Sequence, residues 1–553
     1  MARPLDHPAL LLRTVRHLRP AQVAHRVRLR AQRAAFARVP AALPVVVRQR
    51  VGERVGWPPG FVPLDAIAMP PGPSAEVAAA GQFRFLEDGR SLGDPPDWLQ
   101  AAVPQLWRFH LHYFEWAWAF AAHGDRAWAA AAFARLWRSW RHGTRPAAGD
   151  AWSPYVVSMR AWALCGVYDT LVAGGPDAQD YVADLARHAA FIRAHLELDV
   201  GGNHLLKNLK ALVGLGVFLD DAVLVARALG RLERELDVQV LADGGHYERS
   251  PSYHCQVLGD LIDSRELVRA TGRGDPARLD DAVGAMRRWL GVMLMPDGDV
   301  PLFNDCTLVG HDRITALSPD RPPLEPLRVL EPSGYVVVRP DGRVHLVADV
   351  GPPSPPDLPA HAHADCLSFE LAIDGRRAVV DSGTSTYQAG ARRAYERSTR
   401  AHNTVEIDGA DQTEVWGAFR AARRAEGRLL GAEQTGDVVE VKATHDGYRR
   451  LPGRPHHVRT WLVSASRLEV RDDVGGGGRH RVAAWLHLAP GVDPARVSVL
   501  GPEDVVVETV AAGSAPAGLV ATAFGALQPS AAVVATVDGD MPVSLTTTFA
   551  LEP

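Results

Sequence analysis

The stretch LSPDRPPLEP, from Leu317 to Pro326, divides the sequence into two parts of different character. Its prolines remove backbone donors and fix φ, so that a regular helix or strand does not continue through it. Before this stretch apolar residues recur at helical spacing, and after it short β-rich runs alternate with turns. The sequence therefore predicts helices first and strands second, joined by a linker.

The first part is predicted to be helical throughout. Leu106, Phe109 and Tyr113 already follow the helical period, and further helical segments are expected at 160–173, 179–197, 203–218, 220–236, 253–271 and 277–295. Many helices in series indicate a layered helical toroid or solenoid. No repeat of fixed period identifies a known solenoid.

The second part is predicted to be an antiparallel β-sandwich. Asp374-Gly375 and Asp408-Gly409 are hairpin signals beside β-rich runs. The runs are 335–339, 344–350, 367–373, 378–381, 404–407, 438–441, 460–463, 468–470, 482–488, 505–507 and 543–549. The predicted fold class is α+β, with a basic helical or extended segment at 1–95, an incomplete α/α toroid at 96–320 and a sandwich at 321–553.

The composition is that of a globular protein and does not indicate a nucleic-acid-binding one. A length of 553 residues indicates two or three domains. The content of 47% hydrophobic and 22% charged residues is typical of a globular protein. Sixty basic and 64 acidic residues leave a net charge of −4, which gives no electrostatic reason to expect nucleic acid as a partner. The four cysteines are scattered without CxxC spacing, which argues against a disulfide framework or a Cys-rich zinc site.

The N-terminal region carries no recognisable membrane or export signal. No apolar run has the length of a membrane-spanning helix, and the longest early run, Pro8–Leu12, is too short for a signal-peptide core. The basic opening forms either an amphipathic helix for a membrane surface or polyanion or, as we favour, a first helix packed on the body. We expect a cytoplasmic location, with a periplasmic or secreted one as the alternative. The sequence does not predict the oligomeric state.

Two polar clusters lie where helices are expected to begin. In the first, Gly201-Gly202 precedes Asn203 and His204; Asn203 is either an ordinary helix cap or part of an anion site at a helix start. In the second, DGGHYERSPSYH (243–254), Ser250-Pro251 is a typical helix start. This loop carries tyrosine and histidine side chains that can act as acid and base, or can simply pack between helices.

A third cluster, His361-Ala-His363-Ala-Asp365, has metal-site spacing. Residues two apart face the same side of an extended segment, and imidazole and carboxylate groups suit zinc. Asp381 and His402 are the candidate further ligands. From the spacing alone, His361 and His363 are both able to bind the metal.

A fourth set, in the early helices, contains Trp107 and Arg160. Aromatic faces stack on sugar rings and arginine forks grip carboxylate or sulfate groups, although aromatic residues at helical spacing are more often core.

Seven motifs together resemble the heparinase II/III-like polysaccharide lyases. They are WRFHLHYFEW, WSPYVVSMR, GGNHLLKNLKAL, DGGHYERSPSYH, HAHADCLSFEL, VVDSGT and RAHNTVEIDG, in family order from about residue 100 to 410. The resemblance implies a toroid followed by a sandwich, and β-elimination on a uronate-containing acidic polysaccharide. In such a reaction the uronate carboxylate is neutralised, a base removes the C5 proton and an acid protonates the leaving oxygen.

The resemblance also implies roles for individual residues. Asn203 would neutralise the carboxylate, Tyr253 would be base or acid, and His361 would be the partner base. Substrate contacts would come from His204, Tyr247, Arg160, Trp107 and Glu248. The resemblance assigns a metal, most often zinc with manganese or calcium as alternatives, to His363, Asp381 and His402, where it would brace the loop that carries His361.

Two other functions fit parts of the sequence. One is a non-catalytic glycan-binding protein associated with bacterial exopolysaccharide production. The other is a glycoside hydrolase, for which Glu248 with Asp243 or Asp260 would be the carboxylate pair. The joint presence of Asn203, Tyr253 and His361 favours elimination. The polymer, whether alginate or a glycosaminoglycan such as heparan sulfate, hyaluronan or chondroitin, is left open.

Overall fold

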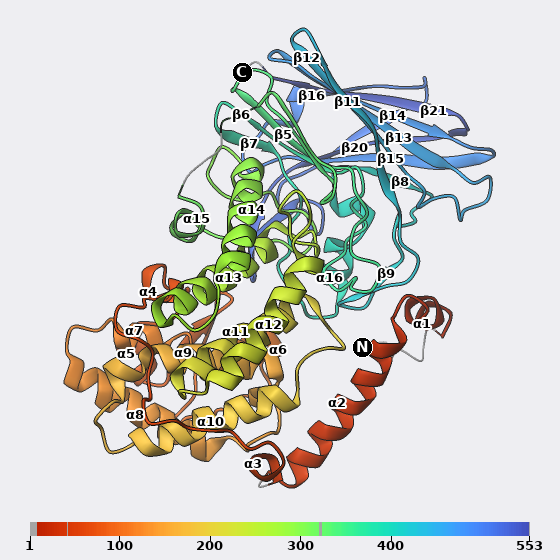
Figure 1. Cartoon of the computed structure of the whole chain (residues 1–553). Coiled ribbons are helices and arrows are strands. Elements are labelled where there is room, and N and C mark those ends of the chain that lie inside the picture. Colours follow the sequence, from red (N-terminus) through yellow and green to blue (C-terminus); the bar gives the residue numbers. More distant parts are fainter. Residues whose placement is uncertain (1–7, 41, 320–322, 324, 552–553) are drawn as a thin grey trace. The chain divides into compact units, whose positions relative to one another are not determined.

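The computed structural model describes residues 8–40, 42–319, 323 and 325–551 (Figure 1). Part of the predicted linker, at 320–322 and 324, lies outside the described residues. The chain divides into two compact units. Unit 1 contains Met1–Leu18, Val240–Cys255 and Ala285–Pro553, and unit 2 contains Arg19–Gln239 and Gln256–Gly284. Residues 240–255 and 285–319 thus belong to the unit that holds the strands of the sandwich, while the domain boundaries predicted at 95 and 320 stay predictions.

Unit 2 is helical, apart from one short hairpin, and its long helices agree with the predicted segments. In this unit α11 packs against α9, α10 and α12, which lie around it in Figure 1. The elements are α2 (Pro20–Arg38), α3 (Ala42–Val46), α4 (Leu64–Ile67), α5 (Ala75–Ala79), β1 (Gln82–Phe85), β2 (Asp88–Ser91), α6 (Gln105–Tyr113), α7 (Ala117–Ala121), α8 (Arg126–Gly143), α9 (Pro154–Leu171), α10 (Ala178–Ala194), α11 (Gly202–Phe218), α12 (Ala222–Gln239), most of α13 (Pro251–Thr271) and the start of α14 (Ala277–Met293).

Helix α11 lies in the interior of unit 2, because side chains on all its faces are buried except that of His204. Gly214 allows this close packing: a Cβ there would lie 2.8 Å from the ring of Trp162. The Nζ of Lys207 lies 2.6 Å from a carboxylate oxygen of Asp260 on α13, and these buried charges are paired.

The basic helix α2 packs on unit 2, as the favoured interpretation of the N-terminal region predicts. Leu29 and Phe36 are buried, and the ring of Phe36 lies 5.5 Å from that of His195. Arg26 forms an ion pair with Asp199 at 3.3 Å. Within the described ranges, no helix is long and apolar enough to cross a membrane.

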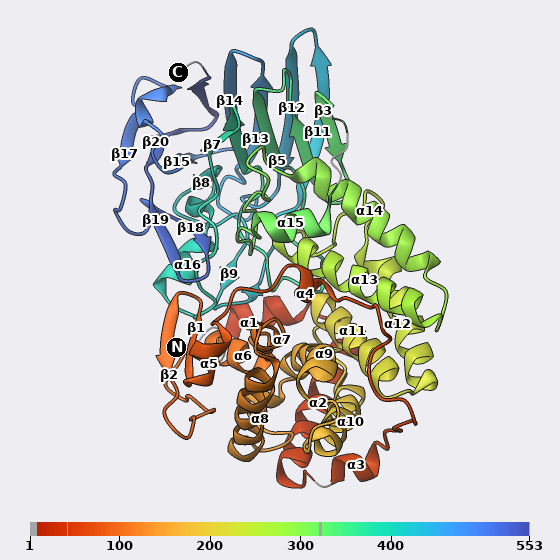
Figure 2. The ribbon, with the colours of Figure 1, turned by 90° about the vertical axis from the view of Figure 1, so that its left-hand side faces the viewer.

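Unit 1 contains three antiparallel sheets that build the sandwich. The orders are β11-β12-β13-β14-β21-β16, β17-β20-β15-β8 and β3-β4-β5-β6-β7, and Figure 2 shows β11 to β14 side by side. The strands of the three sheets are β3 (Leu327–Leu330), β4 (Tyr335–Val338), β5 (Val344–Asp349), β6 (Phe369–Ile373), β7 (Arg376–Val379), β8 (Val405–Ile407), β11 (Gly427–Thr435), β12 (Val438–His445), β13 (His456–Val463), β14 (Arg467–Gly475), β15 (Arg479–His487), β16 (Val497–Leu500), β17 (Val506–Val510), β20 (Ala532–Asp540) and β21 (Val543–Ala550).

The six-stranded sheet shares one apolar core with each of the other two sheets. Val336, Phe369 and Trp461 belong to the core shared with the five-stranded sheet. Ile407 and Leu545 belong to the core shared with the four-stranded sheet. Unit 1 also contains α1 (Pro8–Val15), the start of α13, most of α14, α15 (His311–Leu317), α16 (Ala391–Glu396), β9 (Val415–Trp416), β10 (Arg420–Ala421), β18 (Leu519–Ala523) and β19 (Ala526–Pro529).

The predicted hairpin at Asp374-Gly375 is confirmed. These two residues join β6 to β7 with φ of 50° and 80°, the left-handed values that a tight two-residue turn requires. On the other face of the five-stranded sheet, Trp289 and Met293 of α14 pack against Tyr335 and Val347.

Candidate functional site

Tyr253 lies in the first turn of α13 in unit 1. Pro251 is the first helical residue, as predicted, and Ser250 donates its hydroxyl to the Asp305 carbonyl at 2.7 Å, which holds the start of the helix in place. The Tyr253 hydroxyl is 2.9 Å from the hydroxyl of Tyr387. Its ring lies 3.9 Å, centroid to centroid, from the imidazole of His361. The two predicted proton-transfer groups are therefore neighbours.

His361 lies between two buried carboxylates. Its Nδ1 is 3.0 Å from Oδ2 of Asp305, and its Nε2 is 3.4 Å from Oε2 of Glu248. Asp305 thus orients the ring and leaves Nε2 directed to the side where Glu248 lies. Glu248, expected to contact substrate, is 2% exposed and contacts the histidine.

Arg393 on α16 neutralises Asp305. Both guanidinium Nη atoms donate to the two carboxylate oxygens, and both side chains are fully buried. Burial by itself would raise the pKa of Asp305, but the Arg393 charge and the hydrogen bonds from His361 and His363 hold it well below its usual range. Asp305 is therefore a fixed anion beside His361.

Tyr253 is a neutral phenol in this environment. Burial raises the pKa of Tyr253 well above its ordinary value, and the nearby Asp305 charge adds to this, whereas the hydrogen bond with Tyr387 acts in the opposite direction. A protonated hydroxyl next to an imidazole is suited to give a proton.

Asn304 connects the two loops that carry these groups. Its side chain donates to the Arg249 carbonyl at 3.0 Å and accepts from the backbone N–H of His363 at 2.9 Å. Its φ of 58° is left-handed, which asparagine tolerates better than most residues. Tyr247 is half-buried in the same loop as Arg249, with its ring 5.3 Å from that of His246.

The second histidine of the HxH pair has different neighbours. His363 Nε2 lies 2.8 Å from Oδ1 of Asp305, and its ring is 5.2 Å from that of His402. His402 Nδ1 is 2.7 Å from Oδ2 of Asp381. Each histidine thus uses one nitrogen for a carboxylate, as metal-binding histidines do.

The predicted metal ligands fit such a site in part. Three buried atoms have no hydrogen-bond partner in the described part of the chain: Nδ1 of His363, Nε2 of His402 and Oδ1 of Asp365. Burial lowers the pKa of His363 to about 3, which keeps its ring neutral and able to ligate. No group of three His, Cys, Asp or Glu residues within the described ranges is arranged to hold a metal ion.

Asn203 belongs to unit 2 and is the second residue of α11, whose N-terminal cap is Gly201 and not Asn203. It is 2% exposed, and its side-chain oxygen accepts from Gln256 at 3.3 Å. Gln256 also donates to the Tyr155 hydroxyl at 2.9 Å, and the Tyr155 ring lies 4.5 Å from His204. His204 is held by Glu197 at 3.2 Å. Asn203 thus lies in a group of polar and aromatic side chains, and these contacts, not a helix cap, fix its side chain.

Two of the expected substrate contacts are core residues. Arg160 is fully buried, donates to the carbonyls of His112 and Ala151, and stacks on Trp140 at 4.5 Å. Trp107 is 1% exposed and donates its indole N–H to the Asp88 carbonyl. Neither side chain reaches the surface in this structure, so their burial does not support the prediction that they contact substrate.

The carboxylates of the hydrolase alternative are also committed elsewhere. Asp243 accepts from the backbone and hydroxyl of Ser333 at 2.9 and 2.7 Å. Asp260 accepts from Lys207 and Lys210 in the interior of unit 2. Hydrolysis needs two carboxyl groups that flank a bond, so these contacts disfavour it.

Sequence reasoning missed Asp305, Arg393 and Tyr387. Each is a single residue outside a recognisable cluster, in FND (303–305), in ARRAYE (391–396) and after DSGT (381–384). Only DSGT was part of a motif, and it would have directed attention to Tyr387 just beyond it.

Comparison with known proteins identifies the family. Residues 86–317 match the family described as Heparinase II/III N-terminus, and residues 322–549 match Heparinase II/III-like, C-terminal. The two matches follow one another along most of the chain. The protein therefore belongs to the heparinase II/III-like family, as its motifs predict.

Individual relatives match this chain over part of their length. FtsZ-localized protein C of Caulobacter vibrioides is 30% identical over 397 residues, covering 69% of this chain and 66% of that protein. The heparin-sulfate lyase of Bacteroides stercoris is 23% identical and covers 48% of this chain and 45% of the lyase. The chain thus spans just under two thirds of the first relative and less than half of the second.

Solved structures confirm the predicted fold class. The crystal structure of heparinase III has a TM-score of 0.74 at 17% identity, covering 92% of this chain and 89% of that one. Heparan sulfate lyase HepC from Pedobacter heparinus has a TM-score of 0.56 at 20% identity and covers 86% and 82%. The fold is a helical toroid with an antiparallel β-sandwich.

Proposed function

We propose that the protein is a polysaccharide lyase that cleaves a uronate-containing acidic polysaccharide by β-elimination. The observation that carries the proposal is the contact of Tyr253 with His361, with His361 held between Asp305 and Glu248. A binding protein has no need of two adjacent proton-transfer groups fixed by a buried ion pair. Membership of a family that includes heparin-sulfate lyases supports the same activity.

The elimination needs one proton removed and one supplied. The C5–H bond breaks, its electron pair forms the C4–C5 double bond, and the C4–O bond breaks as the leaving oxygen takes a proton. In our proposal His361 receives the C5 proton and Tyr253 supplies the proton to the oxygen, because its raised pKa keeps it protonated. The product carries a 4,5-unsaturated uronate end.

Asn203 is proposed to neutralise the uronate carboxylate, since a carboxylate that stays charged opposes carbanion formation at C5. Asn203→Ala is expected to lower kcat about a hundredfold or more with little change in KM. Steady-state kinetics would check this. A change confined to KM would make Asn203 a binding residue only.

The substrate is proposed to be a glycosaminoglycan of the heparan sulfate type, because three curated relatives are heparin-sulfate lyases. Hyaluronan, chondroitin and alginate are the alternatives. The cleaved bond in all of them lies beside a uronate, so the same site chemistry serves each.

We further propose that the protein binds a divalent metal, with zinc as the first candidate. His363 and His402 would be the nitrogen ligands, and Asp381 or Asp365 would be the carboxylate ligand. Their buried, unpartnered ring nitrogens and carboxylate oxygen support this. When bound, the metal would brace the loop of His361 as a structural cation.

A second candidate is a glycan-binding protein without turnover. It is favoured by one observation, the 30% identity to a relative named for FtsZ localization and not for an activity. In this second candidate function, the protein would bind a glycan without cleaving it.

The deciding experiment is an ultraviolet scan of the purified protein with a panel of uronate polymers. The panel contains heparan sulfate, heparin, hyaluronan, chondroitin sulfate, dermatan sulfate and alginate, with Tyr253→Phe as control. Growth of unsaturated-uronate absorbance with the natural protein, and none with the variant, would establish the lyase and its polymer. Binding of a polymer without absorbance would support the second candidate.

A further inference from the structure

We propose that Tyr387 is a positioning residue of the reaction site, which holds and polarises the Tyr253 hydroxyl through a direct hydrogen bond. Its expected effect on turnover rests on the proposed lyase function. The existence of the tyrosine pair does not, and it is tested separately below.

The Tyr387 ring is fixed by its neighbours. Phe419 and Phe524 contact it edge to face, with centroid distances of 5.1 and 4.7 Å. The Arg393 guanidinium lies over the same ring at 4.9 Å. The ring therefore has packing partners of its own, and among the described residues the hydroxyl has one hydrogen-bond partner, the Tyr253 hydroxyl at 2.9 Å.

Arg393 is itself buried and held by several hydrogen bonds. Its Nη atoms donate to Asp305, and its Nε donates to the Ala418 carbonyl at 3.1 Å. One buried cation thus fixes His361 through Asp305 and Tyr253 through Tyr387. Both proton-transfer groups of the proposed reaction are positioned from the same point.

The chemistry gives the hydrogen bond a direction. When the Tyr253 O–H bond breaks and its proton passes to the leaving oxygen, negative charge develops on the Tyr253 oxygen. A Tyr387 O–H that donates to this oxygen stabilises that charge. Consistent with this direction, the hydrogen bond from Tyr387 lowers the pKa of Tyr253, although burial dominates and raises it.

Tyr395 provides a contrast within the same segment. It is a buried tyrosine on α16, with Arg392 over its ring at 5.4 Å. Its hydroxyl has no hydrogen-bond partner among the described residues. Tyr395→Phe therefore removes an equivalent hydroxyl without touching Tyr253, and it is the matched control.

The test compares Tyr387→Phe with Tyr395→Phe in the full chain. Tyr387→Phe should lower kcat about tenfold to a hundredfold, with KM changed by less than about twofold, since the ring packing is kept. Tyr395→Phe should leave both constants unchanged. The double variant Tyr253→Phe/Tyr387→Phe should be no slower than Tyr253→Phe alone, because Tyr387 acts through Tyr253.

A second readout does not depend on turnover. In protein labelled with ¹³Cζ-tyrosine, the NMR signal missing from Tyr253→Phe identifies Tyr253. That signal should shift in Tyr387→Phe and stay in place in Tyr395→Phe. An unmoved Tyr253 signal, or an unchanged kcat in Tyr387→Phe of an active enzyme, would overturn the inference. Absence of activity on every polymer would count against the lyase function, and the NMR signal would still decide the tyrosine pair.

Discussion

Unit 1 contains two buried clusters built from the same residue types. In one, Arg393 forms a two-pronged ion pair with Asp305, which also accepts from His361 and His363. In the other, Arg459 forms a two-pronged ion pair with Asp472 at 2.6 and 2.9 Å, and His457 also donates to Asp472. Composition and burial alone would not distinguish them.

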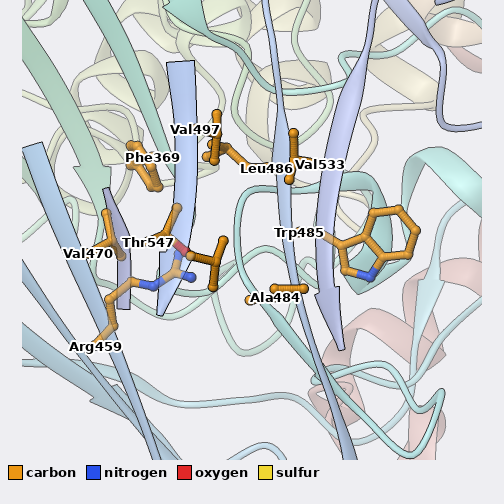
Figure 3. A pocket seen from close by; sticks show the side chains of 11 residues that line it. Phe369, Arg459, Val470, Ala484, Trp485, Leu486, Val497, Val533 and Thr547 are labelled. Atoms are coloured by element: carbon orange, nitrogen blue, oxygen red, sulfur yellow. The ribbon is translucent and has the colours of Figure 1, made fainter. Parts of the chain in front are cut away.

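Their surroundings differ. Arg459 also donates to the Leu367 and Asn403 carbonyls and lies beside the rings of Phe369 and Trp461 in the sandwich core. Figure 3 shows it lining a pocket with Val470 and other apolar side chains. The Arg393 cluster instead contacts Tyr387, Glu248 and, through His361, Tyr253. A buried ion pair thus joins neighbouring strands of a sheet in one place and holds the groups of the proposed reaction in the other.

The largest expected difference between the clusters concerns Tyr253. Tyr253→Phe should lower turnover by about a thousandfold or more, because a proton donor is lost while the ring packing remains. Near-normal turnover of this variant would remove Tyr253 from the mechanism. Tyr448→Phe is the control beside the Arg459 cluster: its hydroxyl donates to the Val405 carbonyl at 2.7 Å, so the change should lower stability and leave turnover alone.

Substituting the two arginines by lysine tests the comparison directly. Arg393→Lys and Arg459→Lys each lose the two-pronged geometry, and each should lower the free energy of unfolding by about 1–3 kcal/mol. Only Arg393→Lys should also lower kcat in the folded protein, by about tenfold or more. Urea unfolding and kinetics measure the two effects, and equal kcat values would remove the distinction.

The histidines of the two clusters should differ in metal content. His363→Ala is expected to lose bound metal and thermal stability, because a ligand is removed. His457→Ala should keep the metal, since His457 contacts only the sandwich cluster. Elemental analysis of the purified variants decides this, and unchanged metal content in His363→Ala would exclude His363 as a ligand.

A third histidine–aspartate pair outside both clusters should have the smallest effect. The hydrogen bond from His480 Nδ1 to Asp408, at 2.7 Å, raises the pKa of His480 above 6.5. The folded state binds this proton more tightly than the unfolded state, so the stabilisation is complete below about pH 6.5 and is lost as pH rises through the raised pKa. The contribution should stay under about 1 kcal/mol.

His480→Gln removes this titration while keeping a polar side chain. The Tm advantage of the natural protein over the variant should shrink between about pH 6 and pH 9. A Tm difference that is constant over this range would show that His480 does not titrate in the predicted sense.

Much of the fold could be predicted from the sequence because it depends on local patterns. Apolar spacing identified the segments that became α9 to α14, and the Asp-Gly dipeptide predicted the hairpin at Asp374-Gly375, where both residues have positive φ. The burial of Arg160 and Trp107, which were expected to contact substrate, could not be predicted, because side-chain type and helix period do not show which face meets solvent. The strands β3, β11, β16, β18, β19 and β20 were missed, and only β16 and β20 among them pair with strands far away along the chain.

By itself, the sequence determined the order of helices and strands, the family, and three residues whose types suit elimination: Asn203, Tyr253 and His361. Only the tertiary structure decided what holds the last two. Asp305, Tyr387 and Arg393 come from loops and a short helix 52 to 140 residues away from Tyr253 along the chain, and no local pattern relates them. The pairing of these side chains depends on burial, because a buried charge is stable only beside a group of opposite charge, and the tertiary fold determines which residue that is.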